Sequence, residues 1–285
     1  MKTDLECIPC FFQQVLRVGR LVFAEEQPIK ELLDTVGQML QDIPLDQPPP
    51  EIARLIYGKI GQISGREDPF AHIKQQSTRQ ALALYPRLQE RVKKSLDPLL
   101  TAIRVAIAGN VIDFGTGKSF EVEEELERIL AQDFALFDYS AFQEDLARSD
   151  RILYLADNAG ETVFDRVLIE RLGKPVIYAV REAPIINDAT AEDARQAGVE
   201  EVAEIISSGC GAPAVIPHLC SREFKHLFET CCRDKLVISK GQGNYEGLSQ
   251  ESGALYYLLT VKCGVVARHL GVTEGAIILK RAGAI

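Results

Sequence analysis

The pattern of hydrophobic and polar positions changes along the chain near residue 105. Before that point, apolar residues recur at helical spacing, for example across Ile29–Leu40. Asp68 as an N-cap and Pro69 at the first helical position predict a further long helix, which is expected to reach about Lys94. No segment here alternates with a period of two, so an all-α part is predicted over residues 1–104.

From residue 105 onward, short apolar runs alternate with amphipathic stretches. The runs predict strands at Ile152–Ala156, Val176–Val180, Glu204–Ser207 and Leu236–Ser239. The stretches between them predict helices at Thr162–Leu172, Ala191–Ala197 and Ser221–Cys232, followed by a last helix at Leu255–Leu270 and a short strand at Ala276–Leu279. This alternation predicts an α/β fold, a Rossmann-like parallel sheet flanked by helices, over residues 105–285.

The end of the first predicted strand carries the most informative polar residues. Asp157 and Asn158 follow the apolar run directly, and Gly160 and Glu161 open the next helix. The carboxyl end of a buried strand that faces a helix N-terminus is where open α/β sheets bind ligands. Oxygen ligands there suit a divalent metal, and the helix N-terminus suits an anion. The combination favours phosphate chemistry.

Polar residues also follow the other predicted strands. Asp188 lies after the second strand, and Lys240 and Asn244 lie after the fourth. Because the carboxyl ends of parallel strands share one edge of the sheet, these side chains are expected to converge with Asp157. Lys240 is a point charge for a phosphate, while Gly241 allows a sharp turn and a close approach of the backbone.

Each of these residues also has an ordinary structural explanation. Asp188 is equally suited to cap the helix that follows it, and Asn158 to form a turn. Lys240 alone is consistent with a solvated surface lysine, and Glu161 with a favourable charge at a helix N-terminus. Their expected convergence on one edge of the sheet favours a site over several independent coincidences.

Composition narrows the class of protein. The 285 residues are 46% hydrophobic and carry a formal net charge of −9, which disfavours nucleic acid as the main partner. No apolar run is long enough for a membrane span, and the N-terminus lacks the apolar stretch of a signal peptide. An odd number of cysteines, seven, fits a reducing compartment better than a disulfide framework, so a cytoplasmic location is expected.

Other motifs give weaker signals. Asn110 and Asp113, after an apolar run, either face the same cleft or form a turn at a helix end. The segment Gly115–Ser119 resembles the tail of a P-loop but lacks its first glycine, and Gly209–Ala214 matches the dinucleotide pattern only weakly. A lone CxxC, Cys7-Ile-Pro-Cys10, leaves redox, metal and buried structural roles open.

An ordered set of short motifs resembles one known family. The set comprises Cys7-Ile-Pro-Cys10, Asp68-Pro69-Phe70 with Lys74, Gly109-Asn110 with Asp113, Asp157-Asn158-Ala-Gly-Glu161 with Phe164-Asp165, Asn187-Asp188-Ala-Thr190, and Lys240-Gly-Gln-Gly-Asn244. Together they resemble the damage-control phosphatase family, once a domain of unknown function and sometimes described as protein-glutamate methyltransferase-like. The CxxC points to the stand-alone, mostly prokaryotic branch.

The resemblance implies metal-dependent hydrolysis of small phosphate esters, such as sugar phosphates, phosphopantetheine derivatives or damaged metabolites. By motif, Asp157, Asn158 and Asp188 match the metal ligands and catalytic residues, and Lys240 matches the phosphate-binding lysine. Magnesium, manganese, cobalt and nickel are the metals associated with such proteins. The further candidates for contact with the substrate are Gly160, Glu161, Asn110, Asp113 and Asn244.

Two other functions remain open at this stage. One is an S-adenosylmethionine-dependent carboxyl methyltransferase, although no clear Gly-rich loop follows the first strand. The other is a non-catalytic protein that binds a metabolite or metal. For a phosphatase, attack by metal-bound water and direct attack by Asp157 are both compatible with the sequence. The sequence indicates neither the ester nor an oligomeric state.

Overall fold

The apolar run at Ile152–Leu155 forms the central strand β2, which is buried at every position. It lies between β3 (Val176–Val180) and β5 (Leu236–Lys240). Both neighbours run parallel to β2 and are buried throughout. Strands that are covered on both faces are continuous hydrophobic runs, because neither face meets water. The chain therefore places its most apolar segments at the middle of the sheet.

The computed structural model describes residues 1–110 and 119–283, and within them seven strands form one sheet in the order β1-β7-β6-β5-β2-β3-β4. Besides the central three, these are β1 (Phe134–Phe137), β4 (Glu204–Ser207), β6 (Leu255–Thr260) and β7 (Ile277–Arg281). Only the β6–β7 pairing is antiparallel among the described pairs. The chain runs outward from β2 to β4 and then returns to β5. The strand order thus reverses between β2 and β5, where open α/β sheets bind ligands.

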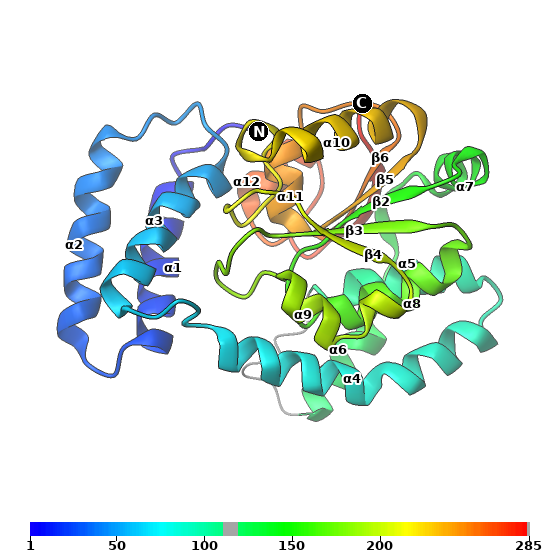
Figure 1. Ribbon diagram of the computed structural model, residues 1–285, viewed down its shortest axis with the longest axis horizontal. Helices are drawn as coiled ribbons and strands as arrows, with labels where there is room; N and C mark the ends of the chain where they lie inside the picture. Colours follow the sequence, from blue (N-terminus) through cyan, green and yellow to red (C-terminus); the bar gives the residue numbers. More distant parts are fainter. Residues whose placement is uncertain (111–118, 284–285) are drawn as a thin grey trace.

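Helices cover both faces of the sheet (Figure 1). One face packs against α4 (Ala71–Lys94), α5 (Pro98–Ala108), α6 (Ser119–Ala131), α7 (Tyr139–Arg148), α8 (Thr162–Leu172) and α9 (Ala191–Gln196). The other packs against α10 (Arg222–Asp234), α11 (Gly241–Leu248) and α12 (Gly264–Leu270). Successive residues of β2 alternate between the two cores, with Tyr154 on the first and Leu155 on the second.

Three N-terminal helices form a bundle beside the sheet, on the left in Figure 1. They are α1 (Cys7–Val22), α2 (Glu26–Asp42) and α3 (Pro49–Ser64), and they share a separate hydrophobic core. By contrast, α4 and α5 pack against α8 and belong to the core of the sheet. The predicted division of the chain at residue 104 stays a prediction. It places α4 with the bundle and divides α5 between residues 104 and 105, whereas both helices pack against α8.

The predicted strands at β2, β3, β4 and β5 are confirmed within one residue, and so is the α/β class of the fold. The predicted helix at Leu255–Leu270 is wrong, because its first six residues form β6 and only Gly264–Leu270 is helical. An apolar run buried on both faces has neither period, so its pattern does not separate a central strand from a buried helix. Strand β1 and helix α7 lie in a region where no element was predicted.

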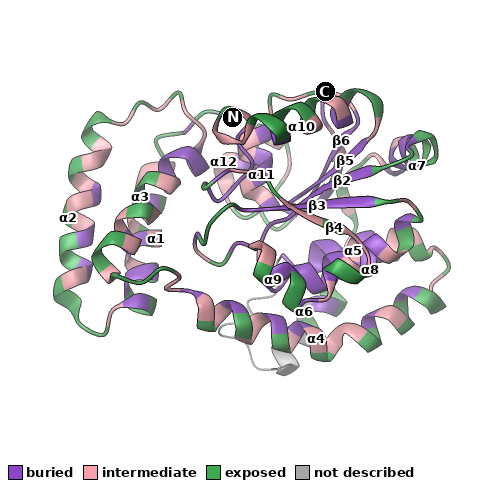
Figure 2. Ribbon diagram, viewed as in Figure 1, coloured by how far each residue is buried: buried purple, intermediate pink, exposed green. Residues whose placement is uncertain are grey.

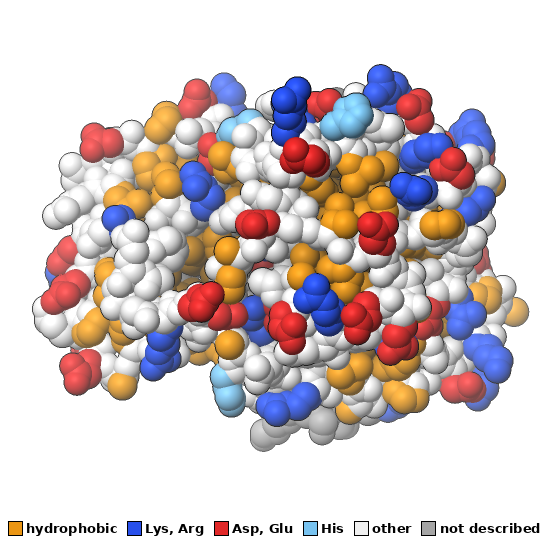
Figure 3. Space-filling model, viewed as in Figure 1, with side chains coloured by type: hydrophobic (Ala, Val, Ile, Leu, Met, Phe, Trp, Pro, Cys, Tyr) orange, Lys and Arg blue, Asp and Glu red, His pale blue; other side chains and the backbone are white. Residues whose placement is uncertain are grey.

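Buried residues are concentrated in the strands, while the outward faces of α1 to α4 are exposed (Figure 2). On the face drawn in Figure 3, acidic and basic side chains are interspersed rather than gathered into fields of one sign. No helix among residues 1–110 and 119–283 combines the length and the apolar character needed to cross a membrane.

Candidate active site

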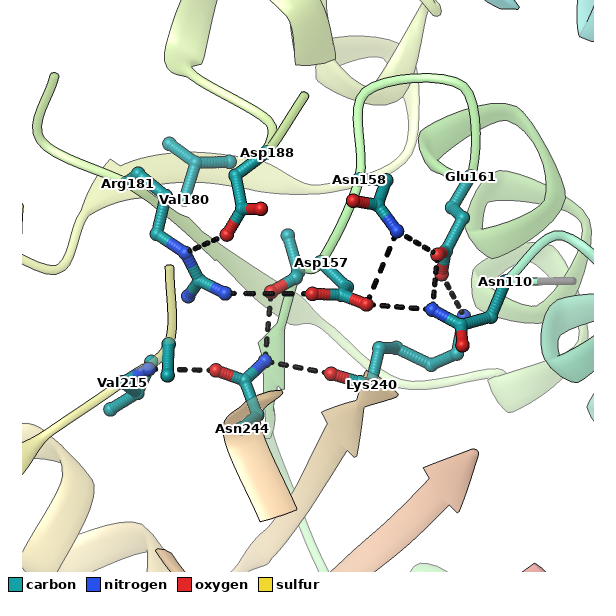
Figure 4. Close-up of polar contacts among 12 residues, drawn as sticks. Asn110, Asp157, Asn158, Glu161, Val180, Arg181, Asp188, Val215, Lys240 and Asn244 are labelled. Atoms are coloured by element: carbon teal, nitrogen blue, oxygen red, sulfur yellow. Dashed lines mark hydrogen bonds and ion pairs between the residues drawn. The ribbon is translucent and has the colours of Figure 1, made fainter. Parts of the chain in front are cut away.

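The loops that follow β2 and β3 are joined to each other at the carboxyl edge of the sheet. Asn158 and Asp188 form an isolated antiparallel bridge. The backbone hydrogen bonds beside it run from Ala159 N to Asn187 O at 2.8 Å and from Ala189 N to Asp157 O at 2.8 Å. The three predicted metal ligands, Asp157, Asn158 and Asp188, are therefore brought together by the backbone itself (Figure 4).

Two amide side chains orient the carboxylate of Asp157. Its Oδ2 accepts from Asn110 Nδ2 at 2.6 Å and from Asn158 Nδ2 at 3.3 Å, and both amides also donate to Glu161. Burial raises the pKa of Asp157 well above its ordinary value, and the charges of Glu161 and Asp188 raise it further. Several carboxylates are thus held close together in a place where water does not screen them.

Two glycines allow close approaches of the backbone, Gly241 to Asp157 in this cluster and Gly109 to Phe164 beside it. Gly241 has a φ of +81°, and a Cβ there would collide with Asp157 Oδ2. Gly109 precedes Asn110, and a Cβ there would lie 2.9 Å from Phe164 Cβ. Glycine is required at Gly241 for both its conformation and its lack of a side chain. The close approach predicted for the glycine segment after β5 is present at Gly241.

Lys240 ends β5 and is completely buried beneath the carboxylates. Its Nζ donates to Ala106 O at 2.7 Å, to Asp165 Oδ1 at 2.6 Å and to Glu161 Oε2 at 3.3 Å. Although burial lowers the pKa of Lys240, Asp165 and Glu161 hold it above its ordinary value. The expected convergence of Lys240 with the Asp157 cluster is present, and the ordinary explanation of a solvated lysine does not apply.

Asn244 is fully buried and bonds to backbone groups of three segments. Its Nδ2 donates to Ala156 O at 2.9 Å and to Lys240 O at 2.8 Å, while its Oδ1 accepts from Val215 N at 2.7 Å. Both of its donors are thereby used. Asn244 therefore connects the ends of β2 and β5 to the loop after β4 by hydrogen bonds, and this fixes the backbone on which Asp157 and Lys240 lie.

Arg181 belongs to this cluster, although the sequence reasoning assigned it no role. It follows β3 directly and is 2% exposed. Its Nε donates to Asp188 Oδ2 at 2.6 Å, and its Nη2 lies 3.7 Å from Asp157 Oδ1. Burial lowers the pKa of Arg181, but Asp188 and Asp157 outweigh that effect and raise it. The signal that could have identified it is a charged residue at the end of an entirely apolar strand.

Gly160 and Glu161 lie at the N-terminus of α8 and are both buried. Asn110 reaches the site, as described, from the end of α5. Asp113, its predicted companion, lies outside the described residues. Cys7 and Cys10 are free thiols on α1, and burial raises the pKa of Cys7 to about 11, which disfavours a reactive thiolate.

The residues of the site suit a divalent cation by their chemistry. Two carboxylates and a carboxamide, from Asp157, Asp188 and Asn158, offer hard oxygen ligands. In Figure 4, one oxygen of Asp188 and the side-chain oxygen of Asn158 are not joined to any residue drawn. Within the described parts of the chain, no group of three His, Cys, Asp or Glu side chains is placed to hold a metal alone. The predicted set of ligands includes the carboxamide of Asn158 beside the two carboxylates.

Comparison with known proteins shows which family the chain resembles. Residues 3–278 match the damage-control phosphatase ARMT1-like domain. The chain is 34% identical over 288 residues to a damage-control phosphatase of Pyrococcus horikoshii. The alignment covers 99% of this chain and 98% of that protein. It is also 34% identical over 290 residues to a damage-control phosphatase of Archaeoglobus fulgidus, with 98% and 99% covered.

A solved structure shows the same fold over the whole chain. The crystal structure of a DUF89 family protein from Pyrococcus horikoshii superposes with a TM-score of 0.88 at 33% sequence identity, and the alignment covers 99% of both chains. The relatives support a phosphatase-type role. The chain belongs to the damage-control phosphatase ARMT1-like family.

Proposed function

We propose that the protein is a metal-dependent phosphatase that hydrolyses small phosphate monoesters. The observation that carries this proposal is an excess of buried negative charge where the strand order reverses. Among the described side chains, the buried charged groups of the cluster are the carboxylates of Asp157, Glu161, Asp165 and Asp188 and the cations of Arg181 and Lys240. Four carboxylates against two cations leave a formal excess of two negative charges.

A divalent cation would neutralise the two excess negative charges of the site. A phosphate ester is an anion, so a cluster with net negative charge repels it. A bound divalent cation would balance the two charges, and Asp157, Asn158 and Asp188 would be its protein ligands. Such a metal supplies a Lewis acid for a phosphoryl oxygen and lowers the pKa of water bound to it. Magnesium, manganese, cobalt and nickel are the candidates.

The residues around the ligands have distinct tasks in this proposal. Asn110 and Asn158 hold one oxygen of Asp157, so that the other points toward Arg181 and Asp188. The prediction that Lys240 binds the phosphate stays a prediction. With its present partners, Lys240 holds Glu161 and Asp165 in place and offsets their charge.

The proposed substrates are small phosphorylated metabolites, including sugar phosphates and phosphopantetheine-like or damaged compounds. Support comes from the family to which the chain belongs and from two relatives that are named damage-control phosphatases. The site lies deep in the fold, since Asp157 is only 8% exposed. A buried position of this kind favours a small ester over a phosphorylated protein segment.

A metal-restoration assay tests the proposal. The protein is stripped of metal and offered a panel of phosphate esters with magnesium, manganese, cobalt or nickel restored in turn. We expect release of phosphate that requires metal and that falls at least about 100-fold in Asp157→Asn, since even outer partners of a metal site are worth 10–100-fold.

The matched control is Asp150→Asn, the same change at an exposed residue that pairs with Lys235. It should leave the rate unchanged. If no ester in the panel releases phosphate with any of the metals, while methyl groups are transferred from S-adenosylmethionine, the proposal is wrong.

A further inference from the structure

Lys240, the lysine expected to bind phosphate, has no donor to spare. An ammonium group has three N–H donors, and those of Lys240 meet Ala106 O, Asp165 Oδ1 and Glu161 Oε2. The side chain is completely buried under these acceptors. To contact a phosphoryl oxygen, Lys240 would have to give up a buried ion pair, which is unfavourable.

Arg181 is in the opposite situation. Its guanidinium has five N–H donors, and Nε alone is used, in the bond to Asp188. Both Nη1 and Nη2 are buried, and neither makes a hydrogen bond to the described residues. Asp157 Oδ1 lies 3.7 Å from Nη2 and forms an ion pair with it. Figure 4 shows the guanidinium directed between Asp157 and Asp188, the two predicted carboxylate ligands.

Buried donors that make no hydrogen bond are rare, because each has given up its hydrogen bonds to water. The ion pair with Asp157 offsets the charge of Arg181, but at 3.7 Å it does not replace those hydrogen bonds. The planar pair of Nη groups matches two oxygens of a tetrahedral anion, which a lysine ammonium does not match. Orientation of Asp188 alone would require only the Nε bond. Together with the ion pair to Asp157, it still does not explain why the Nη donors make no hydrogen bond.

We propose that Arg181 is the residue that binds the phosphoryl group, through Nη1 and Nη2, on the side of Asp157 and Asp188. This inference rests on the proposed function and deepens it, because it names the contact to the transferred group. Lys240 then acts beneath the site, as a positioning residue for Glu161 and Asp165. The ligand that Arg181 would bind is the phosphoryl group of the ester, or inorganic phosphate, once the metal is bound.

Calorimetry with inorganic phosphate tests the proposal in the metal-loaded protein. Arg181→Lys retains the charge but loses the fork, and Arg181→Gln removes the charge as well. We expect the dissociation constant of phosphate to rise at least about tenfold in Arg181→Lys, the value of one charge-assisted hydrogen bond, and further in Arg181→Gln. Affinity for manganese in the absence of phosphate should stay within about threefold of wild type in Arg181→Lys, which keeps the positive charge.

Arg195→Lys is the matched control, because Arg195 lies on α9 with 52% of its side chain exposed. It should bind phosphate as the wild type does. The melting temperature of each variant shows whether it is folded. If Arg181→Gln does not fold, Arg181→Lys still decides the test.

Two results overturn the assignment of Arg181. One is wild-type phosphate affinity in Arg181→Lys, whatever its affinity for manganese. Weaker manganese binding in the same variant would then leave Arg181 only the task of orienting Asp188. The other is a wild-type protein that binds manganese but no phosphate. Absence of ester hydrolysis in the wild type, with phosphate binding that still depends on Arg181, would instead contradict the proposed function and leave the anion site in place.

Discussion

Asn158 and Asp188 face each other across an isolated antiparallel bridge, although they follow different strands of a parallel sheet. Backbone hydrogen bonds on either side of the bridge hold the two loops at a fixed spacing. The predicted ligands are therefore positioned by main-chain bonds, before any cation contributes. Such preorganisation limits the conformational entropy lost when a ligand binds.

Metal should stabilise the protein more at alkaline than at acidic pH. Burial is the main cause that raises the pKa values of Asp157 and Asp188 above their ordinary value of 3.8, so protons compete with the metal in acid. Manganese added to metal-free protein should increase the melting temperature more at pH 8 than at pH 5. Scanning calorimetry measures the difference, and equal increases at both pH values would contradict the expectation. Asp157→Asn should show little increase at either.

Gly241→Ala should weaken both the fold and the site. A residue with a side chain at a φ of +81° costs about 1–2 kcal/mol, and the added Cβ also meets Asp157. Denaturant unfolding should show a loss of at least that size, and affinity for manganese should fall. Gly211→Ala is the control, since a Cβ there has no heavy atom within 4 Å and its φ is not positive. A Gly241→Ala protein with wild-type stability would contradict the clash.

Glu246→Gln should flatten the pH dependence of stability. Burial raises the pKa of Glu246 from its ordinary 4.5 to about 7, and Gln242 donates to it at 2.8 Å. The folded protein thus holds this proton more tightly than the unfolded chain. Its contribution to stability is complete below about pH 4.5 and is lost as the pH rises to about 7. The melting temperature of metal-free Glu246→Gln should fall less than that of wild type over this interval, and parallel curves would refute the assignment.

Lys74→Met should destabilise the protein by about 3–5 kcal/mol, the usual result of removing one partner of a buried ion pair. Lys74 is 3% exposed and contacts Asp68 at 2.7 Å and Asp193 at 2.8 Å, which joins the start of α4 to the first turn of α9. Lys94→Met in the same helix should change stability by less than about 0.5 kcal/mol, since Lys94 is 77% exposed. Urea unfolding of both variants checks the contrast.

The sequence was sufficient to predict the elements that carry Asp157, Asp188 and Lys240. The strands before them are short apolar runs with clear ends, and parallel topology then brings their carboxyl ends together. The prediction at β6 was wrong because of the same uniform apolar character. A strand in the middle of the sheet has no alternation of polar and apolar residues, so its pattern does not distinguish it from a buried helix.

Tertiary contacts determine the parts of the site that pattern alone does not reveal. In the sequence, Arg181 is a residue at the start of a loop. Only the pairing of the loops that follow β2 and β3 brings Asp157 and Asp188 to its guanidinium. Lys240 was expected to face a ligand, yet its donors meet Ala106, Asp165 and Glu161. Sequence spacing locates a side chain at an edge of the sheet but does not specify its hydrogen-bond partners.

Ile186 links the helical bundle to the cluster of carboxylates. Its side chain packs against the core of α1 to α3, while its backbone has a φ of +41°, the only positive value among the described residues other than glycine. The next two residues are Asn187 and Asp188. The packing of Ile186 against the bundle thus stabilises an unfavourable backbone conformation directly before Asp188, so local opening of the bundle would remove the contact that supports it. Metal occupancy should then slow hydrogen exchange of bundle amides that contact no ligand, and removal of the bundle should cost the protein its metal affinity.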